Sequence, residues 1–201
     1  DTTTPTAVLI ATSDVTTNNT TTAIAGTAEA GSTVEVLNGT TLVASTTANA
    51  SGAWAATVEL SSTATLTAQS IDAAGNSVTG GSVTVTIDTT VPVVSVARVA
   101  DTSNGLFDGG FTVTDSATLT VTVNGTALDS TELAAKFAST TVEGVTTYTA
   151  AAGQFAGTEV VVVSATKSDT AGNVGSASLV LEAIDTTTPT AVLIATSDVT
   201  T

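Results

Sequence analysis

Residues Asp1–Thr17 read DTTTPTAVLIATSDVTT, and residues Asp185–Thr201 repeat the same sequence without a change. An unchanged repeat at a spacing of 184 positions predicts one period of a tandem array, followed by the beginning of the next period. Arrays of this kind form extended structures in which each repeat contacts its neighbours. We therefore expect a protein built for length, without a single unique active site.

A weaker period lies inside the first one. Asp88 opens DTTVPVVSV, which matches DTTTPTAVL at the Asp, at both Thr residues and at Pro. We call residues 1–5, 88–92 and 185–189 the D-T-T-x-P segments. Two other stretches, DAAGN at 72–76 and DTAGN at 169–173, precede a segment by the same interval, and we call them the D-x-A-G-N turns. These repeats predict domains at 1–87 and 88–184, with 185–201 as the first strand of a further repeat.

The composition favours β-structure and a surface that attracts cations. β-Branched Thr and Val pack well on pleated sheets. Because 42% of the residues are hydrophobic but only 3% are aromatic, the core must consist largely of small side chains. The formal net charge of −15 repels nucleic acid and anionic membrane surfaces. The chain has no cysteine for a disulfide, and no apolar run of about 18 residues that would insert into a membrane.

Short alternating stretches separated by turn residues predict an all-β fold. In the first domain we expect strands at 7–11, 20–25, 33–37, 41–47, 53–58, 64–70 and 82–87. In the second domain we expect strands at 93–99, 111–114, 118–123, 146–150, 159–166 and 178–184. Asn-Gly pairs at 38–39 and 124–125 predict hairpin turns. Asp129 and Glu132 have the spacing of a capping box, which predicts one short helix near 130–137. The pattern is typical of tandem immunoglobulin-like β-sandwiches with about seven strands each.

Several stretches resemble a known family. GTAEAGSTVEVLNG (Gly26–Gly39), TANASGAW (Thr47–Trp54), the D-x-A-G-N turns and the D-T-T-x-P segments are similar to the bacterial immunoglobulin-like repeats of giant surface adhesins. These adhesins include biofilm-associated proteins and the extender regions of type I-secreted adhesins. The resemblance implies that the repeats form a stalk, that calcium at the joints between repeats stiffens it, and that adhesion itself resides in other domains.

The topology of a seven-stranded sandwich brings acidic residues together at the joints. Successive strands alternate in direction, so the loop after the first strand and the loop before the last strand lie at opposite ends of a domain. Acids from three stretches then converge on the joint at 88, namely Asp14, Asp88, Asp115 and Asp169. The joint near 185 is expected to use Asp101, Asn104, Asp108 and Asp185, and the N-terminal joint Asp1, Glu29 and Asp72.

This grouping of acids predicts calcium sites. Crowded carboxylates repel one another, and Ca²⁺ takes about six to eight oxygen ligands from flexible loops, whereas Mg²⁺ requires a tight octahedral cage. The absence of His and Cys disfavours zinc and copper. The alternative interpretation is that these Asp and Asn residues are ordinary turn residues, whose side chains hydrogen-bond to the nearby backbone.

The sequence thus predicts a structural protein, the extender or stalk repeats of a secreted or cell-surface bacterial adhesin. Calcium would stiffen the interdomain joints, and the neighbouring repeats of the same chain would be its partners. We expect no enzyme, because the chain lacks histidine and offers no nucleophile beside a base. One alternative is lateral association of repeats into a filament, sheath or surface layer. Another is a carbohydrate- or ice-binding module that uses the Thr-rich stretch VTTNNTTTA (Val15–Ala23).

Overall fold

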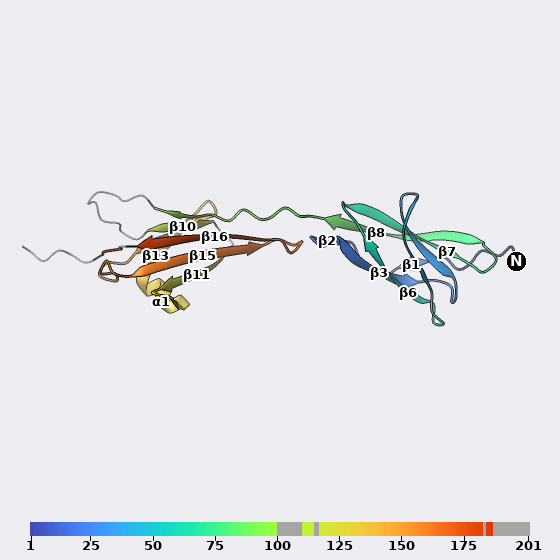
Figure 1. Cartoon of the computed structure of the whole chain (residues 1–201), viewed down its shortest axis with the longest axis horizontal. Helices are drawn as coiled ribbons and strands as arrows, with labels where there is room; N and C mark the ends of the chain where they lie inside the picture. Colours follow the sequence, from blue (N-terminus) through green and yellow to red (C-terminus); the bar gives the residue numbers. More distant parts are fainter. Residues whose placement is uncertain (100–109, 115–116, 183, 187–201) are drawn as a thin grey trace, which may run out of the picture. The chain divides into compact units, whose positions relative to one another are not determined.

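The computed structural model describes residues 1–99, 110–114, 117–182 and 184–186, which divide into two compact units (Figure 1). Unit 1 comprises Asp1–Val91 together with Ser168–Asn173. Unit 2 comprises Pro92–Lys167 and the described residues from Val174 onward. Within the described parts of the chain, no helix has the length and apolar character needed to cross a membrane.

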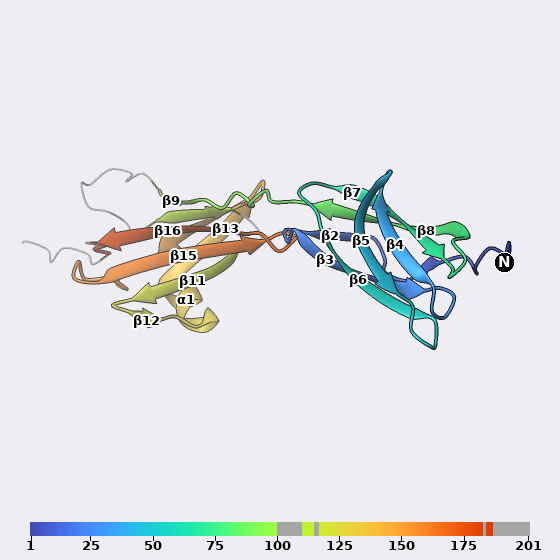
Figure 2. The same ribbon diagram turned by 45° about the vertical axis from the view of Figure 1, so that its right-hand side comes forward.

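Unit 1 is a sandwich of two β-sheets. The smaller sheet has the order β1-β3-β6, with β1 at Leu9–Ile10, β3 at Thr21–Thr27 and β6 at Ala53–Glu59. The larger sheet has the order β2-β8-β7-β4-β5 (Figure 2), and its strands are β2 Val15–Thr17, β8 Ser77–Ile87, β7 Ala64–Ile71, β4 Thr33–Asn38 and β5 Thr41–Thr47.

Alternation of apolar and polar residues builds the core of unit 1. Along β7, Ala64, Leu66 and Ala68 are buried, while the residues between them are exposed or half-buried. Val side chains from β4, β6 and β8 fill most of the remaining space, and Trp54 at 4% exposure is the largest side chain in this core. The core therefore consists mainly of β-branched and small residues, as the composition predicts.

The first segment of unit 1 differs from the sequence-based expectation. The single strand expected at 7–11 is a two-residue strand, β1, and a second strand, β2, lies in the stretch expected to be a loop. β1 pairs antiparallel with β3, whereas β2 pairs parallel with β8 in the other sheet. The chain thus passes from the smaller sheet to the larger one between β1 and β2, and two side-chain hydrogen bonds explain this change. The Thr12 hydroxyl accepts the Ala25 amide at 2.8 Å and ends the first pairing, and the Asp14 carboxylate accepts the Thr84 amide at 2.7 Å, at the start of the second.

Unit 2 is also built from two sheets. One has the order β13-β14-β10-β9, with β13 Phe137–Val142, β14 Val145–Ala150, β10 Phe111–Thr114 and β9 Val96–Arg98. The other has the order β12-β11-β15-β16, with β12 Thr126–Ala127, β11 Thr118–Val123, β15 Val160–Ser168 and β16 Val174–Glu182. The core of unit 2 contains a group of aromatic side chains, in which the Phe111 ring stacks on Tyr148 and meets Phe137 edge-on.

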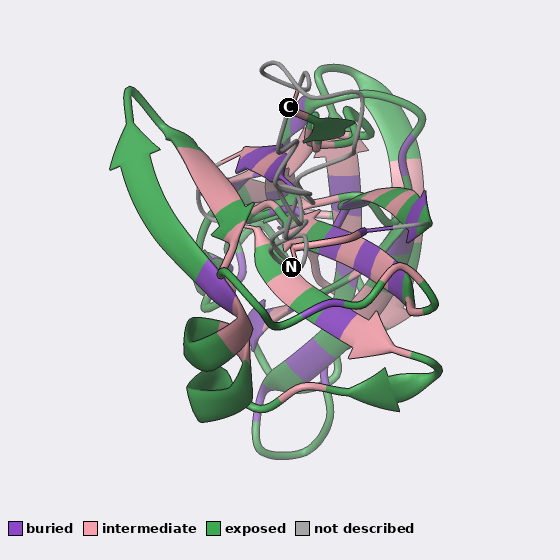
Figure 3. Cartoon of the chain, turned by 90° about the vertical axis from the view of Figure 1, so that its left-hand side faces the viewer, coloured by how far each residue is buried: buried purple, intermediate pink, exposed green. Residues whose placement is uncertain are grey.

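The predicted helix is present as α1, Ser130–Lys136. Its capping box is complete, because the Asp129 carboxylate accepts the Glu132 amide at 2.8 Å and the Glu132 carboxylate accepts the Asp129 amide at 3.0 Å. The helix ends at Lys136, because Phe137 already begins β13, a strand that the sequence did not indicate. Figure 3 shows the strand after the helix as exposed along nearly its whole length, with only Phe137 buried.

The all-β, immunoglobulin-like class predicted from the sequence is confirmed, and so is the hairpin turn at 124–125. A hairpin is also present near 38–39, but its two turn residues are Gly39 and Thr40, because Asn38 still belongs to β4 and pairs with Thr41. Asn124 and Gly125 both have positive φ angles, 49° and 83°, as the two-residue turn between β11 and β12 requires. The division at residues 87 and 184 stays a prediction.

Candidate functional site

The first D-x-A-G-N turn is a compact hydrogen-bonded loop around the Asp72 carboxylate. Oδ1 of Asp72 accepts the main-chain amides of Ala74 at 2.9 Å and Asn76 at 2.8 Å. Gly75 has a φ angle of +91°, a conformation that residues with a Cβ rarely adopt, which is why Gly occupies this place. Hydrogen bonding from the Asn76 side chain is the main cause that lowers the pKa of Asp72 below its ordinary value. The carboxylate is therefore a fixed negative charge.

The second D-x-A-G-N turn reproduces this geometry. Oδ1 of Asp169 accepts the Asn173 main-chain amide at 2.9 Å, and Gly172 has a φ angle of +92°. Hydrogen bonding from the Asn173 side chain again lowers the pKa of the Asp169 carboxyl. Two turns far apart in sequence thus have one conformation and one charge state.

Each D-x-A-G-N turn is bound to a D-T-T-x-P segment through its Asn side chain. The Nδ2 group of Asn173 donates to the Asp169 carboxylate at 2.8 Å and to the main-chain oxygen of Asp88 at 2.9 Å. In the first copy, Asn76 Nδ2 donates to the Asp72 carboxylate at 2.7 Å and to the Asp1 main-chain oxygen at 3.4 Å. The sequence placed the acids of turn and segment together, and in the structure an Asn amide joins them.

Asn76 and Asn173 were not singled out from the sequence. Their position suggests ordinary turn residues, and the bond to the segment spans 75 and 85 positions, which no local pattern reveals. The sequence does contain one indication of their role. An Asn is the last residue of both D-x-A-G-N turns, and both turns lie at the same interval before a D-T-T-x-P segment.

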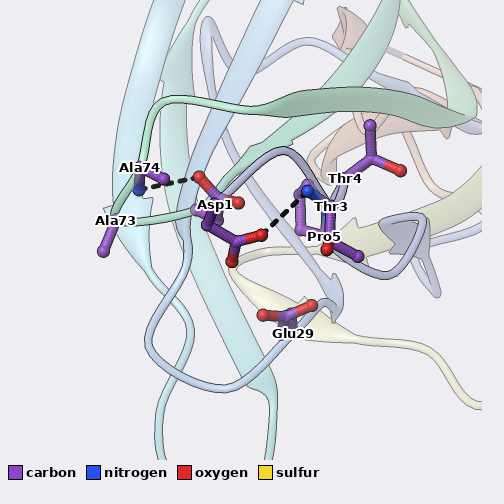
Figure 4. A pocket seen from close by; sticks show the side chains of 8 residues that line it. Asp1, Thr3, Thr4, Pro5, Glu29, Ala73 and Ala74 are labelled. Atoms are coloured by element: carbon purple, nitrogen blue, oxygen red, sulfur yellow. Dashed lines mark hydrogen bonds between the residues drawn. The ribbon is translucent and has the colours of Figure 1, made fainter.

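Three acids predicted for the N-terminal joint line one open pocket of about 570 Å³ in unit 1 (Figure 4), namely Asp1, Glu29 and Asp72. Asp1 Oδ1 accepts the Thr3 amide at 2.8 Å, and Glu29 Oε2 accepts the Thr6 amide at 2.9 Å. Both carboxylates therefore hold the first D-T-T-x-P segment and its continuation. The rest of the pocket wall comes from Thr3, Thr4, Pro5, Ala73 and Ala74.

The other predicted ligands have different surroundings. Asp88 Oδ1 accepts the Thr90 amide at 2.9 Å, which matches Asp1 and Thr3 in the first segment. Asp14 is bound to the β8 main chain through Thr84. Asp185 forms a single β-bridge with Ala156. The remaining candidates lie outside the described residues, namely Asp101, Asn104, Asp108 and Asp115.

The donor chemistry of the pocket suits Ca²⁺, since its lining residues offer carboxylate and Thr hydroxyl oxygens without sulfur or imidazole. Within the described part of the chain, however, no three acidic side chains are close enough together to form a metal-binding group. The pocket therefore gathers the right ligands without assembling a complete coordination sphere.

Comparisons with known proteins agree with the fold. Residues 9–89 match the model of the bacterial Ig-like domain family. A comparison with curated proteins gives no match. The structure of a Ca²⁺-stabilized adhesin that helps an Antarctic bacterium reach out and bind ice has a TM-score of 0.53 at 22% identity. That alignment covers 91% of our chain and 50% of the adhesin chain, so our chain spans half its length.

A second similar structure comes from a 1.5-MDa bacterial ice-binding adhesin, with a TM-score of 0.47 and 21% identity. It covers 90% of our chain and 65% of that chain. At 22% identity, the structure of the Ca²⁺-stabilized adhesin supports the fold alone.

Proposed function

We propose that residues 9–89, which match the model of the bacterial Ig-like domain family, form such a domain, and that the chain belongs to the extender or stalk region of a secreted or cell-surface bacterial adhesin. Its role is to carry an adhesive domain away from the cell, and it performs no catalysis. The unchanged repeat of Asp1–Thr17 at Asp185–Thr201 supports this role, because serial repetition is how such proteins gain length.

The observation that carries the proposal is the repeated pairing of a D-x-A-G-N turn with a D-T-T-x-P segment. The two copies have matching bonds to Asp88 and to Asp1, at main-chain oxygens that are equivalent in the period. A pairing that recurs at the segments beginning with Asp1 and Asp88 supports a mechanical role for these segments. A connection of this kind limits hinge motion far more than a Gly/Ser-rich linker, which behaves as a random coil.

We include calcium in the proposal. Asp1, Glu29 and Asp72 would supply carboxylates to one ion. Asp88 and Asp169, the counterparts of Asp1 and Asp72 in the second repeat, would supply carboxylates to a second ion. Bound Ca²⁺ contributes positive charge and oxygen coordination, which would relieve the repulsion that a net charge of −15 imposes. The residues of the turn fix the Asp72 carboxylate in its ionised form, ready for a cation.

Calcium titration calorimetry tests this part of the proposal. We expect saturable binding with a dissociation constant of about 10⁻⁴–10⁻³ M, as in extracellular calcium modules. The variants Asp72→Asn and Glu29→Gln should lose the site at the pocket. Glu143→Gln is the matched control, because it removes one exposed acid in the turn between β13 and β14 and should leave binding unchanged. Heat that does not saturate with calcium, or equal loss in the control, would rule out calcium at this pocket.

One observation favours a second candidate, lateral association between copies. β13 is an edge strand, and its residues Ala138–Val142 are exposed and carry no charge, so its unpaired backbone lacks the usual protection against pairing with another strand. Sedimentation velocity over a range of concentrations tests this candidate. Association that is abolished by Thr140→Lys would support it, whereas a monomer at every concentration would exclude it.

The carbohydrate- or ice-binding alternative gains no support from the fold. The stretch Val15–Ala23 is divided between β2 and β3, which belong to different sheets of unit 1. Its Thr residues therefore do not form one flat face.

A further inference from the structure

We propose that Asn76 and Asn173 are positioning residues that fasten each D-x-A-G-N turn to its D-T-T-x-P segment without any metal ion. We call this contact the Asn latch, defined as the two hydrogen bonds from one Asn Nδ2 group to the turn carboxylate and to the main-chain oxygen of the segment Asp. The hydrogen bonds of the latch do not depend on the proposed function. Only the purpose of the latch, to stiffen the stalk, rests on that proposal.

The Asn173 latch is well formed in the structure. A side-chain amide has two N–H donors, and here both have acceptors, the Asp169 carboxylate at 2.8 Å and the Asp88 oxygen at 2.9 Å. Asn173 is only 7% exposed, so neither bond is readily exchanged for water. A second contact supports the same docking, because the Asn18 amide donates to the Ala171 oxygen at 2.9 Å. All these residues belong to unit 1.

The chemistry of the latch explains why the residue is Asn. Both acceptors are oxygens, and one of them is a carboxylate, so the connecting group must offer two donors and no negative charge. An Asp at this position would be acceptor-only and would repel Asp169. A Ser would offer a single donor. Asn is also suited to the turn itself, where its main-chain amide binds the same carboxylate at 2.9 Å.

The two latches differ in strength. The bond from Asn76 to the Asp1 oxygen is 3.4 Å long, and Asn76 is half-buried. The corresponding bond from Asn173 is 2.9 Å long, and Asn173 is buried. A shorter bond away from solvent is the stronger one, so substitution of Asn173 should have the larger effect.

The latch has a consequence for cation binding. It holds the turn carboxylate next to the segment before any cation arrives, so less ordering remains to be done when the ion binds. The segment should therefore stay docked in a chelator, and loss of the latch should weaken calcium binding although no carboxylate has been removed.

Amide hydrogen exchange of the full chain in EDTA, followed by NMR, tests the latch directly. In Asn173→Ala, the amides of Asn18 and Asp88 should exchange about two- to tenfold faster than in the unaltered protein, as expected for loss of one hydrogen bond. These amides report docking because they donate to Ala171 and Thr17. Asn49→Ala is the matched control, since the Asn49 side chain bonds only within its own turn, to Ser51 and Ala53.

Unfolding monitored at Trp54 and Tyr148 verifies that both units remain folded in the variants. Should Asn173→Ala fail to fold, Asn173→Ser keeps one donor and adds no charge, and it should still accelerate the exchange of the same two amides. Unchanged exchange in the folded variant would overturn the latch. Because the exchange measurement contains no calcium, a protein that binds no calcium but loosens on substitution contradicts the calcium proposal alone.

Discussion

Gly26→Ala tests how unit 1 holds its first strand, which continues from the D-T-T-x-P segment. Gly26 lies in β3 opposite Ile10 of β1. A Cβ at this position would lie 1.9 Å from the Leu9 main-chain oxygen and 3.0 Å from an atom of the Trp54 ring. Because atoms do not approach this closely, β1 must move away from β3 by more than about an ångström.

The cost follows from what the movement disturbs. Overpacking of a well-packed core typically costs about 1–3 kcal/mol. Full release of β1 would expose Val8, which is 0% exposed and whose burial is worth about 1.5–3 kcal/mol. Both routes give a loss near 2 kcal/mol, which for a domain of this size lowers the melting temperature by about 10 °C.

Urea unfolding followed by tryptophan fluorescence measures this loss in unit 1 alone, because Trp54 is the single tryptophan of the chain. Tyr148, the single tyrosine, reports unit 2 and should show an unchanged transition. Thr27→Ala is the control, as an exposed neighbour on the same strand that should change stability by less than about 0.5 kcal/mol. If Gly26→Ala is as stable as this control, the close approach of β1 and β3 is wrong.

Three further predictions concern the turns, the segment and the helix. Folding lowers the pKa of Asp72 below its ordinary value of 3.8, so the ionised carboxylate stabilises unit 1 at any pH above 3.8. This stabilisation is lost as the pH falls through the lower pKa of the folded state. The difference in urea midpoint between the unaltered protein and Asp72→Asn should therefore be constant near neutral pH and shrink below pH 3.8; a constant difference down to about pH 2 would contradict this assignment. Asp88→Ala should speed proteolysis within residues 88–92 while the Trp54 and Tyr148 transitions stay in place, and global unfolding would refute the placement of Asp88. Asp129→Ala removes the helix cap and should destabilise unit 2 by about 1 kcal/mol, measured from the Tyr148 transition, whereas Thr131→Ala should have little effect.

The sequence was informative about the fold wherever one face of a strand is buried. β10 and β11 match the predicted bounds because alternation, turn residues and burial all agree there. β5 also matches, although none of its residues is fully buried, because the turn signal at 38–39 marks where it begins. β13 was missed because its residues after Phe137 are exposed, so no apolar period marks it. β2 was missed because a three-residue strand that pairs in parallel depends on where β8 lies, which is a tertiary feature.

The sequence predicted which acidic residues belong to one D-T-T-x-P segment, but it did not predict which atoms form the hydrogen bonds there. The register of the repeats predicted Asp1 with Asp72, and Asp88 with Asp169, at one D-T-T-x-P segment in each case. In the structure one Asn side chain contacts both members of each pair. The sequence suggested repelling carboxylates bridged by a cation. In the structure an Asn amide connects the two members of each pair, because the segment offers its main-chain oxygen as the acceptor. Which atom of a residue meets a partner depends on backbone direction, and spacing alone does not determine that.

Small-angle X-ray scattering of the chain in calcium and in EDTA tests the stalk proposal most directly. If calcium stiffens the connections at the D-T-T-x-P segments, its addition should lengthen the maximum dimension and narrow the distribution of interatomic distances, and Asp72→Asn with Asp169→Asn should abolish this response. Identical scattering curves with calcium and with EDTA, at concentrations that calorimetry shows to be saturating, would contradict a calcium-stiffened stalk.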